Sequence, residues 1–373
     1  MARTLATLAV GFLALSNVLA HPGEDPQIEA AERRAFLKRN PKTVRSCDTH
    51  LSKRGHDDSA QLRRAAYKAR ARGLQGLPTV EKRDVAFNFS HASDSPVALG
   101  GDELDLFAND GTCLLAPDVE QGPFYVDGAL IRSSIRETQA GVPLYLDIQI
   151  IDTTTCEPLP AVFVDVWHCN ATGVYGGVLG SGNGDESDLS NLQNTFLRGI
   201  QSTDKNGVVQ FSTIFPGHYG GRATHVHVLT HNSNETTART NGTIIDASNN
   251  FTTYASHTGQ TFFDQDLITK VNELDPYTGD TIAIVENAVD RVLLEEAANV
   301  DPIYDYTLLG DDLSDGILAW IRIGIDPSVD SATSAASTYH PDGGAVQDTD
   351  NTMQGGGGGV GGNTTGGTNS TGA

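Results

Sequence analysis

The sequence lacks the features of several large protein classes. After residues 1–20 it has no second apolar run long enough to cross a bilayer, so we expect no membrane span. No Rossmann or P-loop fingerprint occurs in a suitable context, which argues against a nucleotide-dependent enzyme. No apolar stretch follows the glycine-rich C-terminal segment, so a GPI anchor is not indicated.

Basic side chains are scarce after residue 83. Of 25 Lys and Arg and 47 Asp and Glu, residues 21–83 contain 15 basic and 8 acidic side chains. With one more arginine in residues 1–20, residues 84–373 have 9 basic and 39 acidic side chains, a formal charge of −30. Such a body repels nucleic acids and anionic membranes and favours a small, largely neutral partner. The same charge also serves solubility in acidic surroundings.

Both ends of the chain have the composition of appendages. Residues 1–20 have a short basic start, an apolar stretch and small residues before a cleavage point, which is the pattern of a secretory signal peptide. We therefore expect a secreted, extracellular protein. Residues 346–373 are rich in Gly, Thr and Asn and are expected to form a flexible tail.

Residues 211–229 contain a chelating pattern. His225 and His227 are two positions apart in a predicted strand, so both imidazoles project from one face. The turn-rich segment 216–221 brings the phenol of Tyr219 toward the same point. A His-x-His pair alone is a weak sign of a metal, because strands also carry such pairs on solvated faces.

The wider order of motifs resembles that of the intradiol ring-cleavage dioxygenases. The similarity covers roughly residues 111–265, and its motifs come in the family's order. They are EQGPFY at 120–125, GVPL at 141–144, DVWHCN at 165–170, Gly-x-Tyr ending at Tyr175, Pro-Gly-x-Tyr ending at Tyr219, Arg-x-x-His-x-His from Arg222, and GQTFF at 259–263.

The resemblance implies a non-haem Fe(III) and its ligands. Phenolate oxygens suit a hard trivalent ion and imidazoles suit a redox-capable site, whereas zinc more often recruits Cys or carboxylates. Arg222 matches the family's substrate-side arginine and Gln260 its glutamine, and Tyr219 is implied to take a proton from the substrate. The implied iron ligands are Tyr175, Tyr219, His225 and His227.

Each candidate residue also has an ordinary explanation. The tyrosines are common packing residues of β-structure, the histidine pair suits a solvated face, and Arg222 suits an ion pair with a surface carboxylate. His168, His218 and His231 are rival ligands. We expect them beside the site or at the surface, because adjacent residues on a strand cannot both face one metal.

The expected fold is mostly β. Short strands with turn signals predict a two-sheet β-sandwich catalytic core over residues 84–345, with decorating helices and an N-terminal helical arm. Residues 144–151 and 161–167 are predicted to pair as a β-hairpin. Further strands are expected at 207–213, 224–229 and 316–325, and helices at 263–274 and 281–298.

The basic, helix-prone residues 21–83 have two interpretations. The dibasic pairs Lys38-Arg39, Lys53-Arg54 and Lys82-Arg83 are sites for a Kex-type protease, and Lys82-Arg83 directly precedes the body. On that basis the segment is a propeptide. Alternatively it is a retained arm that packs on the body or joins two protomers into a homodimer, as N-terminal helices do in catechol-cleaving relatives.

Four cysteines in an exported chain allow three pairings. Cys156 and Cys169 lie at opposite ends of one predicted strand, where about ten residues at ~3.3 Å each exceed disulfide reach. Cys169 lies at the metal end of that strand and Cys113 shortly before the EQGPFY motif. We therefore predict Cys113–Cys169 and Cys47–Cys156.

Seven sequons suit N-glycosylation in a secreted chain, and we expect about half to be occupied. Asn170 is disfavoured because the neighbouring metal loop would crowd a glycan. The sequons begin at Asn88, Asn170, Asn234, Asn241, Asn250, Asn363 and Asn369.

The predicted function is a secreted Fe(III) dioxygenase that uses O₂ to cleave catechol-type rings between the two hydroxyls, giving muconate-type dicarboxylates. No organic cofactor is needed for such chemistry. Two alternatives stay open: a β-sandwich glycoprotein that binds ligands or partners without catalysis, and a copper or manganese cupin-like enzyme, which would need no tyrosines.

Overall fold

The computed structural model describes residues 44–77, 112–114, 122–232, 236–246, 254–255, 257–297, 300–329, 331–333, 335–339 and 345–347. Within these ranges no helix is long and apolar enough to cross a membrane. The predicted signal peptide, Lys82-Arg83, the predicted C-terminal tail and the sequons at Asn88, Asn234, Asn250, Asn363 and Asn369 lie outside the described residues.

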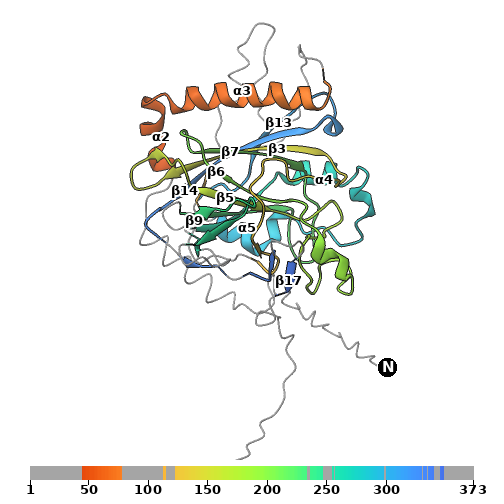
Figure 1. Cartoon of the computed structure of the whole chain (residues 1–373). Coiled ribbons are helices and arrows are strands. Elements are labelled where there is room, and N and C mark those ends of the chain that lie inside the picture. Colours follow the sequence, from red (N-terminus) through yellow and green to blue (C-terminus); the bar gives the residue numbers. More distant parts are fainter. Residues whose placement is uncertain are drawn as a thin grey trace, which may run out of the picture.

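Two larger sheets form a sandwich (Figure 1). The first has six strands in the order β1-β14-β3-β4, with β13 also paired to β14 and β7 to β3. The second has four strands in the order β12-β8-β5-β6. The strands of the first are β1 (Thr112–Leu114), β3 (Pro143–Asp152), β4 (Glu157–Pro158), β7 (Val208–Ile214), β13 (Asp305–Leu308) and β14 (Ile317–Ile325), and those of the second are β5 (Phe163–Trp167), β6 (Arg198–Ser202), β8 (His225–His231) and β12 (His257–Phe262).

Small sheets and several helices surround the sandwich. The small sheets are β2 (Val126–Asp127) with β16 (Ser337–Tyr339) and β17 (Ala345–Gln347), β9 (Thr236–Ala238) with β10 (Ile244–Asp246), and β11 (Tyr254–Ala255) with β15 (Ser331–Ala332). The helices are α2 (Val44–Lys53), α3 (His56–Leu74), α4 (Gln265–Val271) and α5 (Arg291–Glu296), with 3₁₀ turns at Leu189–Gln193, Tyr277–Gly279, Asn287–Val289 and Leu313–Asp315. The predicted mostly-β sandwich with decorating helices is confirmed.

Alternation along the strands gives each sheet a core face and an outer face. In β3, Leu146 and Ile148 lie in the main hydrophobic core, whereas Tyr145 packs on the opposite side of its sheet. In β8, Val226 and Val228 lie in the same core. Because side chains alternate, His225 and His227 lie on the outer face of the four-stranded sheet.

The predicted β-hairpin is wrong. β3 and β5 lie in different sheets, and β3 pairs only briefly with β4, where Ile151 is opposite Pro158. The chain then crosses to the other sheet near Ala161, which has φ 63°. Both strands contribute apolar side chains to the core between the sheets. Their alternation suits face-to-face packing as well as edge-to-edge pairing, so the pattern alone did not distinguish the two.

The helix predicted over 281–298 is much shorter than expected, whereas α4 lies within the predicted 263–274. Asp290 has an extended backbone, and its side chain accepts a hydrogen bond from Leu293 N. This N-cap makes Arg291 the first residue of α5.

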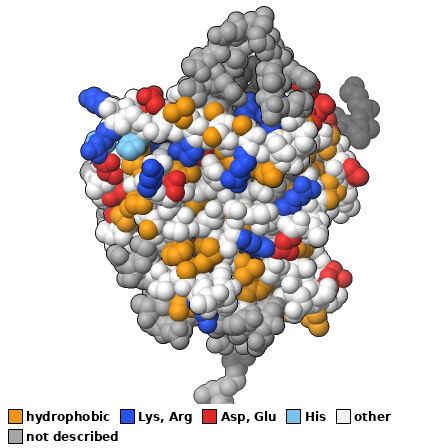
Figure 2. Space-filling model, turned by 45° about the horizontal axis from the view of Figure 1, so that its top comes forward, with side chains coloured by type: hydrophobic (Ala, Val, Ile, Leu, Met, Phe, Trp, Pro, Cys, Tyr) orange, Lys and Arg blue, Asp and Glu red, His pale blue; other side chains and the backbone are white. Residues whose placement is uncertain are grey.

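The described part of the N-terminal arm packs on the outer face of the six-stranded sheet (Figure 1). Tyr67 and Ala71 of α3 bury against Tyr145, Leu318 and Trp320. The view in Figure 2 shows Lys and Arg side chains interspersed with Asp and Glu on this side of the molecule. The arm therefore contacts its own body, and a homodimer through it stays a prediction.

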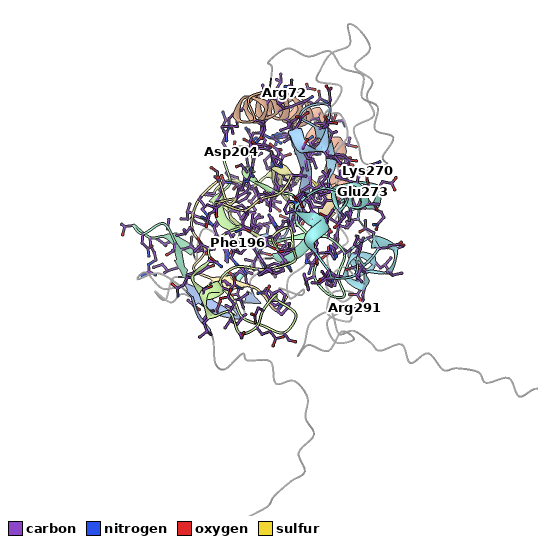
Figure 3. All side chains as sticks on the ribbon, turned by 90° about the vertical axis from the view of Figure 1, so that its right-hand side faces the viewer. Arg72, Phe196, Asp204, Lys270, Glu273 and Arg291 are labelled. Atoms are coloured by element: carbon purple, nitrogen blue, oxygen red, sulfur yellow. A yellow bond between two sulfur atoms is a disulfide. The ribbon has the colours of Figure 1, made fainter. Side chains whose placement is uncertain are left out.

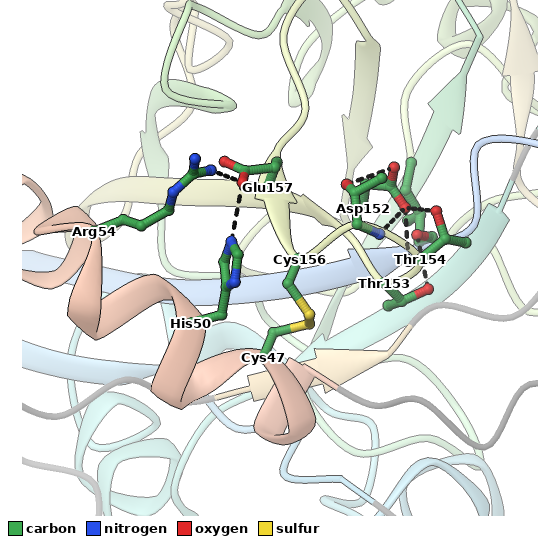
Figure 4. Close-up of a disulfide and its surroundings, with 10 residues drawn as sticks. Cys47, His50, Arg54, Asp152, Thr153, Thr154, Cys156 and Glu157 are labelled. Carbon is green, nitrogen blue, oxygen red and sulfur yellow. Dashed lines mark hydrogen bonds and ion pairs between the residues drawn. A yellow bond between two sulfur atoms is a disulfide. The ribbon is translucent and has the colours of Figure 1, made fainter.

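One disulfide prediction is confirmed and the other is wrong. Cys47 of α2 is bonded to Cys156, and His50 and Arg54 of α2 also contact Glu157 beside it (Figure 4). Cys169 is a buried free thiol. Cys113 is paired with Ile323 in the six-stranded sheet, whereas Cys169 follows β5 of the other sheet. Stacked sheets lie ~10 Å apart, which exceeds the reach of a disulfide.

The two described sequons differ in their environments. Asn241 is exposed between β9 and β10. The side-chain oxygen of Asn170 accepts hydrogen bonds from Thr172 and Val174 and holds its own loop together.

Candidate metal centre

His225 and His227 meet on the outer face of the four-stranded sheet. Their Nε2 atoms are 3.1 Å apart, and the residues are only 2% and 1% exposed. The Nδ1 of His225 lies 2.7 Å from the carbonyl oxygen of Ala223, which can only accept a hydrogen bond. Nδ1 therefore carries the proton, and Nε2 of the neutral ring keeps a lone pair that can bind a metal ion. Burial and the charge of Arg222 lower the pKa of His225 to about 3, so the ring is neutral near pH 7.

Neighbouring strands hold the plane of His227. Trp167 of β5 and Gln260 of β12 are its cross-strand partners on either side. The indole of Trp167 stacks on the imidazole with 4.7 Å between ring centroids and 6° between planes. Cross-strand neighbours project from the same face, so the three side chains form a row at the site.

Tyr175 and Tyr219 complete the cluster from two loops. Their rings lie 5.5 Å apart, Tyr175 is 5.9 Å from His227, and Tyr219 is 5.6 Å from His225. Both hydroxyl oxygens are buried and lack a hydrogen bond of good geometry with the described residues, although Arg222 lies close enough to Tyr219 to lower the pKa of its phenol. A buried hydroxyl without a partner costs roughly 1–3 kcal/mol, so the phenol of Tyr175 in particular indicates a missing partner.

The donor set fits a metal ion. Burial raises the pKa of Tyr175 well above its usual value and that of Tyr219 to about 12, so both phenols need a nearby cation to ionise. Two phenol oxygens and two imidazole nitrogens suit a hard, redox-capable ion. Among the described residues, no group of three or more His, Cys, Asp and Glu side chains forms a metal site, so this one depends on the phenols.

Two glycines allow the tyrosine loops to approach each other. Gly173 has φ 80°, and a Cβ there would lie 2.2 Å from the carbonyl oxygen of His218. A Cβ on Gly217 would lie 2.6 Å from the carbonyl oxygen of Asn170. Only glycine fits at such contacts, so the Gly-x-Tyr and Pro-Gly-x-Tyr patterns have a steric cause.

Arg222 lies beside this cluster in a buried network. Its Nε donates to Asp290 Oδ2 at 2.9 Å, and its Nη2 donates to Gln260 Oε1 at 2.5 Å. Burial alone would raise the pKa of Asp290, but Arg222 and backbone donors hold it below its usual value. The expected ion pair with a carboxylate exists, but inside the protein rather than at its surface. In Figure 3, Arg291, the residue after Asp290, lies far from Arg72 of the arm.

The three rival histidines have other partners. His168 contacts Thr213 Oγ1 at 2.8 Å, His218 contacts the carbonyl oxygen of Ile282 at 2.9 Å, and His231 lies 3.9 Å from Asp165. All three are buried. Of the two positions that the sequence predicted for them, beside the site or at the surface, the surface position is therefore wrong.

Sequence reasoning missed Asp290. It lies 68 residues after Arg222, beyond the last family motif. An aspartate before an apolar helical run is a recognisable N-cap, but no local pattern links it to Arg222.

The comparisons with known proteins agree with the motifs. Residues 119–296 match the family model described as Dioxygenase, and this range contains every residue of the cluster and network above. No curated protein sequence matches the chain.

Several solved structures are similar to the chain. An intradiol ring-cleavage dioxygenase from Tetranychus urticae is 25% identical, with 60% of this chain and 97% of that chain covered and a TM-score of 0.47. The dioxygenase domain of a carbohydrate-binding fusion from Streptomyces sp. SirexAA-E is 21% identical, with coverages of 56% and 95% and a TM-score of 0.35. A catechol 1,2-dioxygenase from Acinetobacter sp. ADP1 is 16% identical, with coverages of 80% and 77% and a TM-score of 0.34.

The family model and the ordered motifs therefore lead to one assignment. Residues 119–296 of the chain are assigned to the intradiol ring-cleavage dioxygenases, which are oxidoreductases.

Proposed function

We propose that this chain is a secreted dioxygenase that binds Fe(III) through Tyr175, Tyr219, His225 and His227 and opens catechol-type rings between their two hydroxyls. The meeting of two imidazole Nε2 atoms and two buried phenol oxygens, of which that of Tyr175 has no partner among the described residues, carries this proposal. The signal-like residues 1–20 and the Cys47–Cys156 disulfide support secretion, because disulfides persist in oxidising compartments.

The metal and the protein have separate tasks. Held by those four side chains, Fe(III) would bind the two oxygens of a deprotonated catechol and accept electron density from it, which would activate the ring for reaction with O₂. Tyr219 Oη would take up one phenolic proton of the substrate. Burial raises the pKa of Tyr219 to about 12 even with Arg222 nearby, so the phenol would keep that proton near neutral pH when it is not bound to the metal. Both oxygen atoms of O₂ end in the dicarboxylic acid product.

Arg222 and Gln260 would provide hydrogen-bond donors beside the aromatic ring of the substrate. Arg222 is held by Asp290, so its charge is already oriented in a buried site. Gln260 Nε2 is buried and has no hydrogen-bond partner among the described residues, which leaves a donor for substrate. Donors fixed in a site that excludes water stabilise developing negative charge more strongly than donors in solution.

A matched pair of variants tests the ligand assignment. His225→Ala should lose iron because it removes a direct ligand, whereas His218→Ala should keep it because His218 bonds to Ile282. Iron assay and the red-brown absorption of tyrosinate bound to Fe(III) are the measurements, with oxygen uptake on catechol for activity. Iron loss in His218→Ala but not in His225→Ala would overturn the assignment. A parent protein that takes up no iron would support the non-catalytic glycoprotein instead.

A further inference from the structure

We propose that Asn183 and Asn191 are positioning residues that hold the backbone of Tyr175, and through it the phenol, at the metal centre. The metal-related part of this proposal rests on the proposed function. The two asparagines lie in the loop between Tyr175 and β6, which no sequence motif covered.

Asn183 holds both backbone polar groups of Tyr175. Tyr175 N donates to Asn183 Oδ1 at 2.6 Å, and Asn183 Nδ2 donates to Tyr175 O at 2.9 Å. The same Nδ2 also donates to Val178 O at 3.0 Å. One amide side chain thus replaces the backbone pairing that a strand would provide, at a residue that lies outside any strand.

Asn191 makes a second attachment to the same carbonyl groups. Its Nδ2 donates to Tyr175 O at 2.9 Å and to Val178 O at 2.8 Å, and its backbone carbonyl oxygen accepts from Gly177 N at 2.9 Å. Asn183 is 2% exposed and Asn191 is 5% exposed. Water therefore has little access to these hydrogen bonds, and loss of the Asn183 side chain leaves the buried N–H of Tyr175 without its acceptor.

The phenol of Tyr175 needs this backbone support because its hydroxyl makes no hydrogen bond within the described structure. Its ring is held by packing, as against Phe124 at 4.9 Å and Tyr219 at 5.5 Å between centroids. A metal ligand must stay within about 0.5 Å of its productive position. The two amides fix the point from which the side chain extends.

The two asparagines should differ in effect. Asn183→Ala removes the acceptor for Tyr175 N and a donor to Tyr175 O, whereas Asn191→Ala leaves Asn183 to bind both groups. We expect Asn183→Ala to weaken iron binding by about 10- to 100-fold, as for other residues that orient metal ligands, and Asn191→Ala to weaken it less. The tyrosinate absorption band should shift in the same order.

A control and a coupling test separate positioning from general stability. Asn272→Ala also removes an amide that donates to a carbonyl, that of Ile268 at 2.8 Å, but at the end of α4. It should leave iron affinity and absorption unchanged. In a Tyr175→Phe background, Asn183→Ala should have little further effect on iron affinity, because residues that act through one group are not additive.

Hydrogen exchange of the iron-free protein tests the backbone contacts without the metal. Asn183→Ala should speed amide exchange in the peptide containing residues 175–177, and Asn191→Ala, the milder variant, should do so less. Unchanged exchange there in both variants, or parental iron affinity and absorption in Asn183→Ala, would overturn the proposal. If the parent chain takes up no iron but Asn183→Ala still exchanges faster than the parent at residues 175–177, the backbone contacts are supported and the proposed function is rejected instead.

Discussion

Arg222 depends on Asp290, a residue 68 positions further along the chain. Asp290 bonds the guanidinium, accepts a hydrogen bond from Ala223 N at 2.7 Å, and caps α5 through Leu293 N. One carboxylate therefore orients the arginine, fixes the start of its strand and begins a helix. This sharing explains how a loop residue such as Arg222 is held firmly in place.

Removing the charge of Arg222 should slow catalysis without loss of iron. Arg222→Ala alone would leave Asp290 buried and unpaired, which typically costs roughly 3–5 kcal/mol of stability. The cleaner variant is Arg222→Gln combined with Asp290→Asn. Its turnover on saturating catechol, measured by oxygen uptake, should fall about 10²- to 10³-fold, the usual cost of losing an oriented donor.

The neighbouring Arg291→Gln is the matched control for the Arg222 variant. Arg291 pairs with Glu295 on a partly exposed helix face, where such a pair contributes about 0–1 kcal/mol. Its turnover and iron content should equal those of the parent. Parental turnover in the Arg222→Gln, Asp290→Asn variant would mean that Arg222 is structural.

At the level of elements, α3 is joined to the sandwich through a buried charge. Arg63 donates from Nη2 to Asp147 Oδ1 at 2.9 Å and from Nε to Oδ2 at 3.1 Å. Gln210 donates to the same carboxylate at 2.8 Å. Burial would raise the pKa of Asp147, but these partners and Arg64 together hold it below its usual value. Asp147 is therefore buried at a cost that the two arginines of the arm offset together with Gln210 of β7.

This pair predicts a pH-dependent stability. The unfolded pKa of an aspartate is about 3.9, and the folded pKa of Asp147 is lower, so its contribution is complete above pH ~4 and is lost as pH falls through the folded pKa. Asp147→Asn should lower the free energy of unfolding by roughly 3–5 kcal/mol near neutral pH. Urea unfolding should show this difference shrinking below pH ~4, and an equal difference at pH 7 and pH 3 would contradict the assignment.

For the whole molecule, the arm is joined covalently as well as by packing. Cys47 and Cys156 are 109 residues apart in sequence, and their disulfide closes a loop that contains Lys82-Arg83. Removal of the segment as a propeptide would break the Arg63–Asp147 pair and still require reduction of this bond. The contacts favour the retained arm over the propeptide.

Cleavage after Arg83 should therefore leave the arm attached. After treatment with a Kex-type protease, a denaturing gel should show one species without reductant and two fragments with it. Cys47→Ser is the control, because its fragments should separate under denaturing conditions without reductant. Loss of residues 21–83 from the non-reduced parent during size-exclusion chromatography would show that the arm is a propeptide.

Local patterns were sufficient for several parts of the fold and the site. Period-2 alternation located β3, β7, β8 and β14 and placed His225 and His227 on one face, because strand geometry is a property of adjacent residues. Glycine patterns marked the two tyrosine loops, because steric demands at Gly173 and Gly217 leave no room for a side chain. The resemblance supplied the four proposed iron ligands together, and the structure brings these side chains to one point.

Only the tertiary structure decided which distant segments meet. Periodicity predicted strands at residues 144–151 and 161–167 but could not assign them to different sheets. It also could not show that Cys113 and Cys169 lie at different sheets and cannot form a disulfide. It did not pair Arg222 with Asp290, Asp147 with Arg63, or Tyr175 with Asn183 and Asn191. The physical reason is that such contacts depend on how the sheets stack and the loops close, which the alternation of neighbouring residues does not encode.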